Sequence, residues 1–214
     1  MREFAERLKS AIRKGLPGTD VQWELASAER HSPDFPKVAG PDAREAGVLI
    51  LLFPVEGSVY TVLMQRPDYE GIHSGQISFP GGKKEFSDEN IIRTALREAE
   101  EETGINSADV SIIGTLTPLF IPVSNMLVTA VTGWMDRRPE FKHNPKEVVF
   151  LIEADLNELM DPLIIRTMPY KVRGNMTEIK YFDYKGNVIW GATAMMLHEL
   201  LSIIKRENIP IATS

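Results

Sequence analysis

Three glutamates near the middle of the chain have a spacing that could hold a metal ion. Glu98, Glu101 and Glu102 stand at positions i, i+3 and i+4 of the segment REAEEETG. On a helix, at about 100° per residue, they share an arc of about 100°. Carboxylates stacked in this way repel one another and lie at the negative end of the helix dipole. A divalent cation removes both penalties, and Mg²⁺ or Mn²⁺ would suit these hard oxygen ligands.

The alternative for this acidic segment is an ordinary solvated helix face. Arg93 and Arg97 could pair with its acids, and runs of charge are more often solvated surface than ligand sites. The glycine pair Gly81-Gly82 further upstream by itself marks only a turn. Neither feature alone separates the metal site from the solvated face, so the two must be read together.

Together these residues resemble the signature of the Nudix hydrolases. Gly82 is followed by REA at 97–99 and by EETGI at 101–105. The spacing from Gly82 to the REA segment is one residue longer than the general pattern. The first acidic position is therefore either Asp88, which keeps the spacing from Gly82, or Glu89, which keeps the spacing to REA. Agreement at this many positions argues against a chance match.

Two further segments are similar to the coenzyme A diphosphatase branch of that family. They read VLMQR at 62–66 and HSGQISFPGG at 73–82, and the branch also tends to have the longer spacing. This resemblance implies hydrolysis of coenzyme A or acyl-CoA to 4′-phosphopantetheine, or its acyl derivative, and 3′,5′-ADP. Two positions depart from the branch: Gly71 replaces an arginine and Met64 a threonine. The loss of that arginine keeps ADP-ribose, NADH or another nucleoside diphosphate derivative open as the substrate.

The family likeness also implies a metal site. Glu98, Glu101 and Glu102 are expected to ligate Mg²⁺ or Mn²⁺ together with a backbone carbonyl of Gly81 or Gly82, of which Gly82 is assigned. Some relatives draw a further carboxylate from outside the signature, and Glu147 is the candidate here. Besides the two substrate classes, a third hypothesis is a Nudix module that binds a ligand without catalysis. The intact glutamates argue against it.

Catalytic and substrate-binding roles follow from the same likeness. Catalysis is assigned to the three glutamates and Arg97; Glu98 is also the candidate base for the attacking water, and Arg97 is expected to orient a neighbouring acid. The candidates for binding a nucleotide-diphosphate substrate are Arg66, His73, Gln76 and Lys83.

The rest of the chain must position these residues. Hydrophobic periodicity predicts helices over 2–14, 88–103, 155–160 and 192–206. Strands are predicted over 46–53, 59–65, 110–117, 126–134 and 147–152, and a hairpin over 177–183 and 187–190. Such a mixture favours a mixed sheet with helices on both faces, and the Nudix likeness implies the same α/β/α sandwich.

The predicted organisation has three parts. Residues 1–45 form an N-terminal helix and a connecting segment, 46–206 the Nudix domain, and 207–214 a tail. Residues 27–44 hold three prolines and are predicted to be a surface connection. Trp190 is expected to anchor the core before the last helix rather than to stack on a base.

Composition limits the remaining function classes. A chain of 214 residues corresponds to about one domain. The absence of cysteine excludes disulfides, cysteine-ligated zinc and thiol nucleophiles. A net charge of −6 argues against non-specific binding to nucleic acid or anionic membranes. The longest apolar stretch, 47–55, is too short to span a bilayer, and no signal-peptide core is visible, so a cytoplasmic protein is expected. The family likeness also suggests a homodimer, which the N-terminal helix and its connection could serve.

Overall fold

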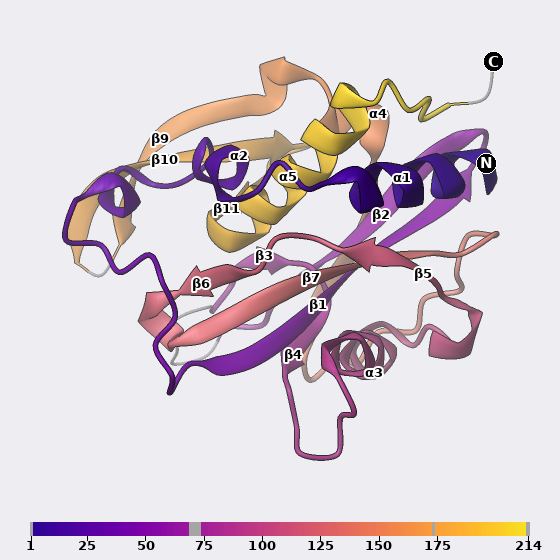
Figure 1. Ribbon diagram of the computed structural model, residues 1–214, viewed down its shortest axis with the longest axis horizontal. Helices are drawn as coiled ribbons and strands as arrows, with labels where there is room; N and C mark the ends of the chain where they lie inside the picture. Colours follow the sequence, from indigo (N-terminus) through magenta and orange to yellow (C-terminus); the bar gives the residue numbers. More distant parts are fainter. Residues whose placement is uncertain (1, 69–73, 173, 213–214) are drawn as a thin grey trace.

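The computed structural model describes residues 2–68, 74–172 and 174–212. Within them, an eight-stranded mixed sheet lies between two helical layers (Figure 1). Helix α3 (Ile91–Thr103) packs on one face, and α1 (Arg2–Lys14) and α5 (Gly191–Arg206) cover the other. The predicted α/β/α sandwich with a mixed sheet is confirmed.

Strand β1 (Arg44–Val55) runs through the centre of the main sheet. It is parallel to β7 (Met126–Trp134) and antiparallel to β2 (Ser58–Gln65) and β4 (Gly81–Lys83). Its residues 49–53 are fully buried, because helices cover both faces of the sheet. The other strands of this sheet are β3 (Ile77–Ser78), β5 (Ser111–Thr115), β6 (Leu119–Ile121) and β8 (Phe150–Asp155).

Helix α3 has well-defined ends. Asn90 caps its start, where its side chain accepts hydrogen bonds from two backbone N–H groups of the first turn. Gly104 ends it in the left-handed conformation, with φ 74°. The predicted start at residue 88 is therefore wrong, because Asp88 bonds within the preceding loop rather than joining the helix.

Close packing brings α3 onto the centre of the sheet. Ala95, Leu96 and Ala99 are buried against it. Gly47 on β1 permits this approach, since a Cβ there would lie 2.7 Å from the carbonyl oxygen of Ile91. The helix that carries the acids is thus fixed directly beside the strand that pairs with the glycine segment.

A separate three-stranded sheet lies beyond the main one. Its order is β11 (Asn187–Trp190), β10 (Asn175–Tyr184), β9 (Ile165–Val172), all antiparallel. The hairpin β10–β11 is confirmed, whereas β9 was not predicted. Pro169 interrupts the strand pattern of β9, and proline is tolerated there because β9 is an edge strand.

The N-terminal segment is more ordered than predicted. Helix α1 is confirmed, but α2 (Thr19–Trp23) and the 3₁₀ helix η1 (Ala28–His31) were not expected. The strand predicted at 147–152 starts later, as β8, because Val148 closes a turn on Asn144. The remaining short helices are α4 (Leu156–Leu159), η2 (Ser107–Asp109), η3 (Pro122–Ser124) and η4 (Pro162–Ile164). None of the helices in the described part of the chain has the length and apolar character of a membrane span.

Candidate active site

The three predicted glutamates line one cleft but differ in their surroundings. The cleft has a volume of about 1720 Å³. Glu102 is only 3% exposed, the Glu98 side chain is 18% exposed, and the Glu101 side chain is 53% exposed. The acidic run is therefore not a uniformly solvated helix face, because its inner member is buried at the cleft wall.

Glu102 is a buried carboxylate with incomplete charge compensation. The backbone N–H of Gly81 donates to it at 2.7 Å, and Arg66 Nη2 lies 3.8 Å from its Oε1. Burial raises the pKa of Glu102 to about 7, although Arg66 and the Gly81 N–H both act to lower it. A further cation near this carboxylate would therefore stabilise its ionised form.

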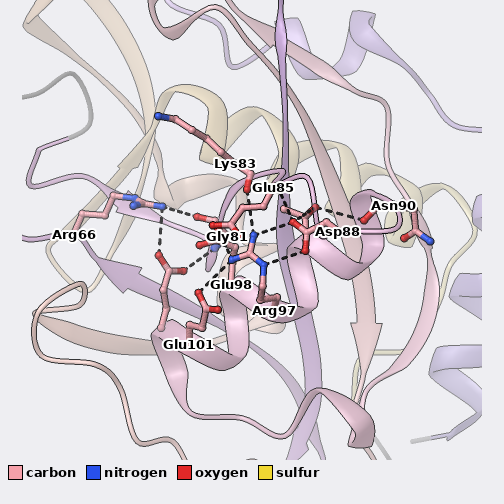
Figure 2. A network of polar contacts seen from close by, with 11 residues as sticks. Arg66, Gly81, Lys83, Glu85, Asp88, Asn90, Arg97, Glu98 and Glu101 are labelled. Carbon is pink, nitrogen blue, oxygen red and sulfur yellow. Dashed lines mark hydrogen bonds and ion pairs between the residues drawn. The ribbon is translucent and has the colours of Figure 1, made fainter.

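Arg97 contacts several acids at once (Figure 2). Its Nε and Nη2 donate to the two oxygens of Asp88 at 3.0 and 2.9 Å. Its Nη1 donates to Glu98 at 3.0 Å and to Glu101 at 3.2 Å. The predicted orienting contact of Arg97 with neighbouring acids is thus present, and it extends to Glu98.

The contacts of Arg97 also decide whether Asp88 or Glu89 is the first acidic residue of the signature. The hydrogen bonds from Arg97 hold the pKa of Asp88 well below its usual range. Asp88 accepts further bonds from the Glu85 N–H at 2.9 Å and from the Thr94 hydroxyl at 3.0 Å. Glu89 is exposed. Asp88 therefore occupies the first acidic position, and it fixes the loop between β4 and α3.

Gly81 and Gly82 are the first two residues of β4, which lies beside the acid-bearing helix α3. The Gly81 carbonyl accepts from Arg66 Nη2 at 2.9 Å. A Cβ at Gly82 would collide with the carboxylate of Glu98. A Cβ at Gly81 would instead collide with the Gly47 carbonyl oxygen, so Gly81 is required for close pairing with β1. Gly82, by contrast, leaves space for the Glu98 carboxylate.

The strand ladder distinguishes the carbonyls of these two glycines. The backbone N–H of Lys84 donates to the Glu45 carbonyl, and the backbone N–H of Leu49 donates to the Pro80 carbonyl. Alternation along an antiparallel ladder makes Gly82 and its partner Gly47 a hydrogen-bonded pair between these two. The Gly82 carbonyl is therefore directed at β1. Gly81, rather than the predicted Gly82, presents its carbonyl on the side of Arg66 and the acids.

The predicted substrate-binding residues have different environments. Arg66 donates to the Ser78 hydroxyl at 3.1 Å and to the Gly81 carbonyl. It thus links β3 to β4 within the cleft. Gln76 and Lys83 both line the cleft. In Figure 2 the Lys83 amine extends away from the Arg97 contacts.

Two positions singled out in the sequence, His73 and Gly71, lie outside the described residues. The structure therefore places neither of them relative to the cleft.

Glu147 lies on a loop that contacts the last turn of α3. The N–H of Asn144 donates to the Glu102 carbonyl at 3.0 Å, which ties this loop to the last turn of α3. Glu147 lines the cleft. Burial raises the pKa of Glu98, and the negative charges of Glu101 and Glu147 add to that effect. The structure thus brings Glu147 near the signature acids.

The donor set suits a divalent cation, although no site is preformed. Among the described residues, no three acidic or histidine side chains converge at a metal-binding spacing. Glu98 and Glu101 instead share Nη1 of Arg97. The undercompensated Glu102 carboxylate and the Gly81 carbonyl provide hard oxygen donors on the same wall. Binding of a cation would therefore require Glu98 and Glu101 to turn from Arg97 toward it.

Part of the cleft wall was not predicted from the sequence. Arg30 from η1, Tyr170 from β9 and Trp190 from β11 all line the cleft. Trp190 is half-buried at this wall and is not simply the core anchor that we expected. All three lie far from the signature in the sequence, and no motif marks Arg30 or Tyr170.

Comparisons with known proteins agree on one family. The model of the NUDIX domain matches residues 43–164, more than half of the chain. The uncharacterized Nudix hydrolase NudL of Photorhabdus laumondii is 33% identical over 168 residues, which cover 78% of this chain and 89% of that protein. NudL of Yersinia pestis is 34% identical over 139 residues, 65% of this chain and 69% of that protein. Among solved structures, the Nudix hydrolase RenU of M. smegmatis superposes with a TM-score of 0.54 and 15% identity, over 80% of this chain and 91% of that one.

Proposed function

Because the chain belongs to the NUDIX domain family of hydrolases, we propose that it cleaves the diphosphate linkage of coenzyme A or an acyl-coenzyme A. The products would be 4′-phosphopantetheine, or its acyl derivative, and 3′,5′-ADP. The cofactor would be Mg²⁺ or Mn²⁺, held by Glu98, Glu101, Glu102 and the Gly81 carbonyl, with Glu147 as a further candidate.

One observation carries the choice of substrate. The two segments that resemble the coenzyme A branch meet at the acid-bearing helix. Arg66, from the first segment, contacts Ser78 and Gly81 of the second and lies 3.8 Å from Glu102. Residues from both segments that resemble the branch therefore contact one another beside Glu102 in the proposed active site.

The residues of this chain divide the chemistry between them. When bound, a divalent cation would neutralise the phosphoryl oxygens and lower the pKa of water. We assign to Glu98 the acceptance of the proton of the attacking water, and burial raises the pKa of this carboxyl above its usual value. Arg97 holds Glu98 and Glu101 beside the cleft before a cation binds. The Gly81 N–H holds Glu102, which keeps the glycine segment against α3.

A second substrate class stays open for a specific reason. Gly71 replaces the arginine of the coenzyme A branch, and such a change removes a cation that would hold an anionic substrate. ADP-ribose, NADH or another nucleoside diphosphate derivative is therefore the alternative. Its hydrolysis would use the same residues on the diphosphate.

The test is a product assay on a substrate panel with a matched pair of variants. With Mg²⁺, we expect wild-type protein to release 3′,5′-ADP from coenzyme A, as identified by mass spectrometry. Glu98→Gln should reduce kcat by about 100-fold or more, because it removes the base. Glu100→Gln is the control, since Glu100 is exposed on the same helix and bonds to Ser107 instead. Chelation of the metal should abolish turnover.

Other outcomes of that assay would contradict the proposal. Release of AMP from ADP-ribose or NADH, without cleavage of coenzyme A, would replace the substrate by the alternative class. Binding without any product would indicate a non-catalytic module. Full activity of Glu98→Gln would remove Glu98 from the mechanism.

A further inference from the structure

The outer wall of the cleft comes from segments outside the matched NUDIX domain. It is formed by η1, which precedes residue 43, and by the sheet β9–β11, which follows residue 164. These two additions pack against each other, since η1 contacts β10 and Lys180 Nζ donates to the Glu24 carbonyl at 3.0 Å. In Figure 1 they lie on the same side of the molecule as α2. Segments from before and after the matched domain thus build one wall of the cleft that the glutamates of α3 also line.

Arg30 is the unusual residue of this wall. Its guanidinium is half-buried, donates to the Phe120 carbonyl at a long 3.4 Å, and lies 5.3 Å from the centre of the Phe35 ring. Among the described residues, no carboxylate forms an ion pair with it within 4.0 Å. Burial lowers the pKa of Arg30 to about 10, although the charge of Glu29 opposes this.

A partly buried cation on a cleft wall, without an ion-pair partner in the described part of the chain, suits an anionic ligand. Burying a charge is costly unless it is paired. An arginine can repay that cost by bidentate hydrogen bonds to a phosphate. The wall therefore offers a phosphate site made of residues other than the acids that would hold the metal.

Aromatic side chains line the same cleft as this cation. The rings of Tyr170 and Trp190 lie 4.7 Å apart at an interplanar angle of 48°, and both line the cleft. Lys171, exposed and next to Tyr170, lines it as well. Aromatic faces beside cations are the combination that binds nucleotides, because the base stacks while the phosphate is neutralised.

We propose that this wall is a subsite for the nucleotide half of the substrate, in which Arg30 binds a phosphate that is not part of the cleaved diphosphate. The inference rests on the proposed function for its link to catalysis. Coenzyme A carries such a phosphate on the 3′ position of its ribose, whereas ADP-ribose and NADH do not. The subsite therefore selects the 3′,5′-ADP half over an AMP half. It also supplies a cation in a chain that lacks the arginine at position 71.

Binding of the two nucleotide halves tests the subsite without any turnover. Titration calorimetry would measure 3′,5′-ADP and 5′-AMP on the full chain in the absence of metal. We expect 3′,5′-ADP to bind wild-type protein about tenfold more tightly, as for one added charged hydrogen-bond pair. Arg30→Gln should remove this difference and leave the affinity for 5′-AMP unchanged.

The matched control is Lys37→Gln, which removes one cation from the same segment. Lys37 faces the Trp23 ring at 4.8 Å and does not line the cleft, so this variant should keep the tenfold preference. Circular dichroism would check that each variant is folded. If Arg30→Gln does not fold, Lys171→Gln decides the question, because it is exposed and should lower the affinity for 3′,5′-ADP by about threefold.

Several results would overturn the subsite. Equal binding of both nucleotides to wild-type protein would do so, as would a preference that survives in folded Arg30→Gln. Unchanged binding by Lys171→Gln, where Arg30→Gln is unfolded, would also do so. Failure to hydrolyse coenzyme A would instead contradict the proposed function, and a preserved preference for 3′,5′-ADP would still support the subsite.

Discussion

At the scale of single residues, one guanidinium organises the acids of the site. Arg97 bonds to Asp88, Glu98 and Glu101 and also donates to the Lys83 carbonyl at 3.3 Å. The Asp88 side chain is 5% exposed and that of Arg97 24%, so their pairing is shielded from solvent. A bidentate pair of this kind is stronger than an exposed surface ion pair. Arg97 therefore acts as a positioning residue whose geometry depends on Asp88.

We expect Asp88→Asn to lower the free energy of unfolding by about 1–3 kcal/mol at pH 7, because it removes charged hydrogen bonds from Arg97. The pKa of Asp88 is lowered in the folded protein. Its stabilising effect is thus present above the unfolded pKa of about 3.9 and is lost as pH falls below that value. Urea denaturation at pH 7 and at pH 3 would measure both effects, and the variant should lose less stability on acidification than wild-type protein.

Glu89→Gln is the control for this prediction, because Glu89 is exposed. Its effect should stay within about 0.5 kcal/mol. Equal destabilisation by both variants would show that Asp88 does not occupy the first acidic position of the signature.

At the scale of secondary-structure elements, a buried polar network joins the N-terminal segment to α5. Glu199 is fully buried and accepts from Gln22 Nε2 at 2.7 Å and from the Thr117 hydroxyl at 2.6 Å. Gln22 also donates to the Thr117 carbonyl at 2.8 Å. The network therefore fixes α2 on α5, and α2 leads directly into η1 with Arg30. The outer wall of the cleft depends on this junction.

We expect Glu199→Ala to lower the free energy of unfolding by about 3 kcal/mol, because buried donors of Gln22 and Thr117 lose their acceptor. Thermal or urea denaturation would measure this. Glu3→Ala, at an exposed acid in the first turn of α1, should change stability by less than about 0.5 kcal/mol. A Glu199→Ala variant as stable as wild-type protein would show that the junction contributes little.

At the scale of the whole molecule, the matched NUDIX domain shares its core with the rest of the chain. Leu8 of α1, Phe182 of β10 and Leu197 of α5 have no exposed surface and belong to the same cluster as Leu52 of β1. One face of the main sheet is thus covered by helices that lie outside residues 43–164. The apolar face of α1 is used within the chain, so a homodimer would need another surface. The homodimer and the cytoplasmic location stay predictions.

We expect the fragment 43–164 to lack a cooperative folding transition, because one face of its sheet would be exposed to water. Circular dichroism during heating, together with binding of a hydrophobic dye, would compare the fragment with the full chain. A sharp unfolding transition at the temperature of the full chain would contradict the shared core.

The sequence alone predicted the acidic helix, because it depends on local spacing, and the resemblance to the Nudix signature implied the family and the α/β/α sandwich. The periodicity of α3 and its stop at Gly104 are fixed by neighbouring residues, as is the apolar run of β1. Spacing could not choose between Asp88 and Glu89, since either count fits the longer signature. Only the folded chain decided it, by placing Asp88 on Arg97.

The remaining features of the cleft needed the tertiary structure for a similar reason. Whether Gly81 or Gly82 presents its carbonyl depends on the ladder with β1, which involves residues far away in the sequence. Arg30 and Trp190 are separated along the chain and come to one wall only through the packing of η1 on β10. Burial is likewise a property of the whole fold, and it raises the pKa of Glu102 while the neighbouring Glu101 stays exposed. Local patterns therefore identify the chemistry of this protein, whereas long-range packing decides which atoms face the cleft.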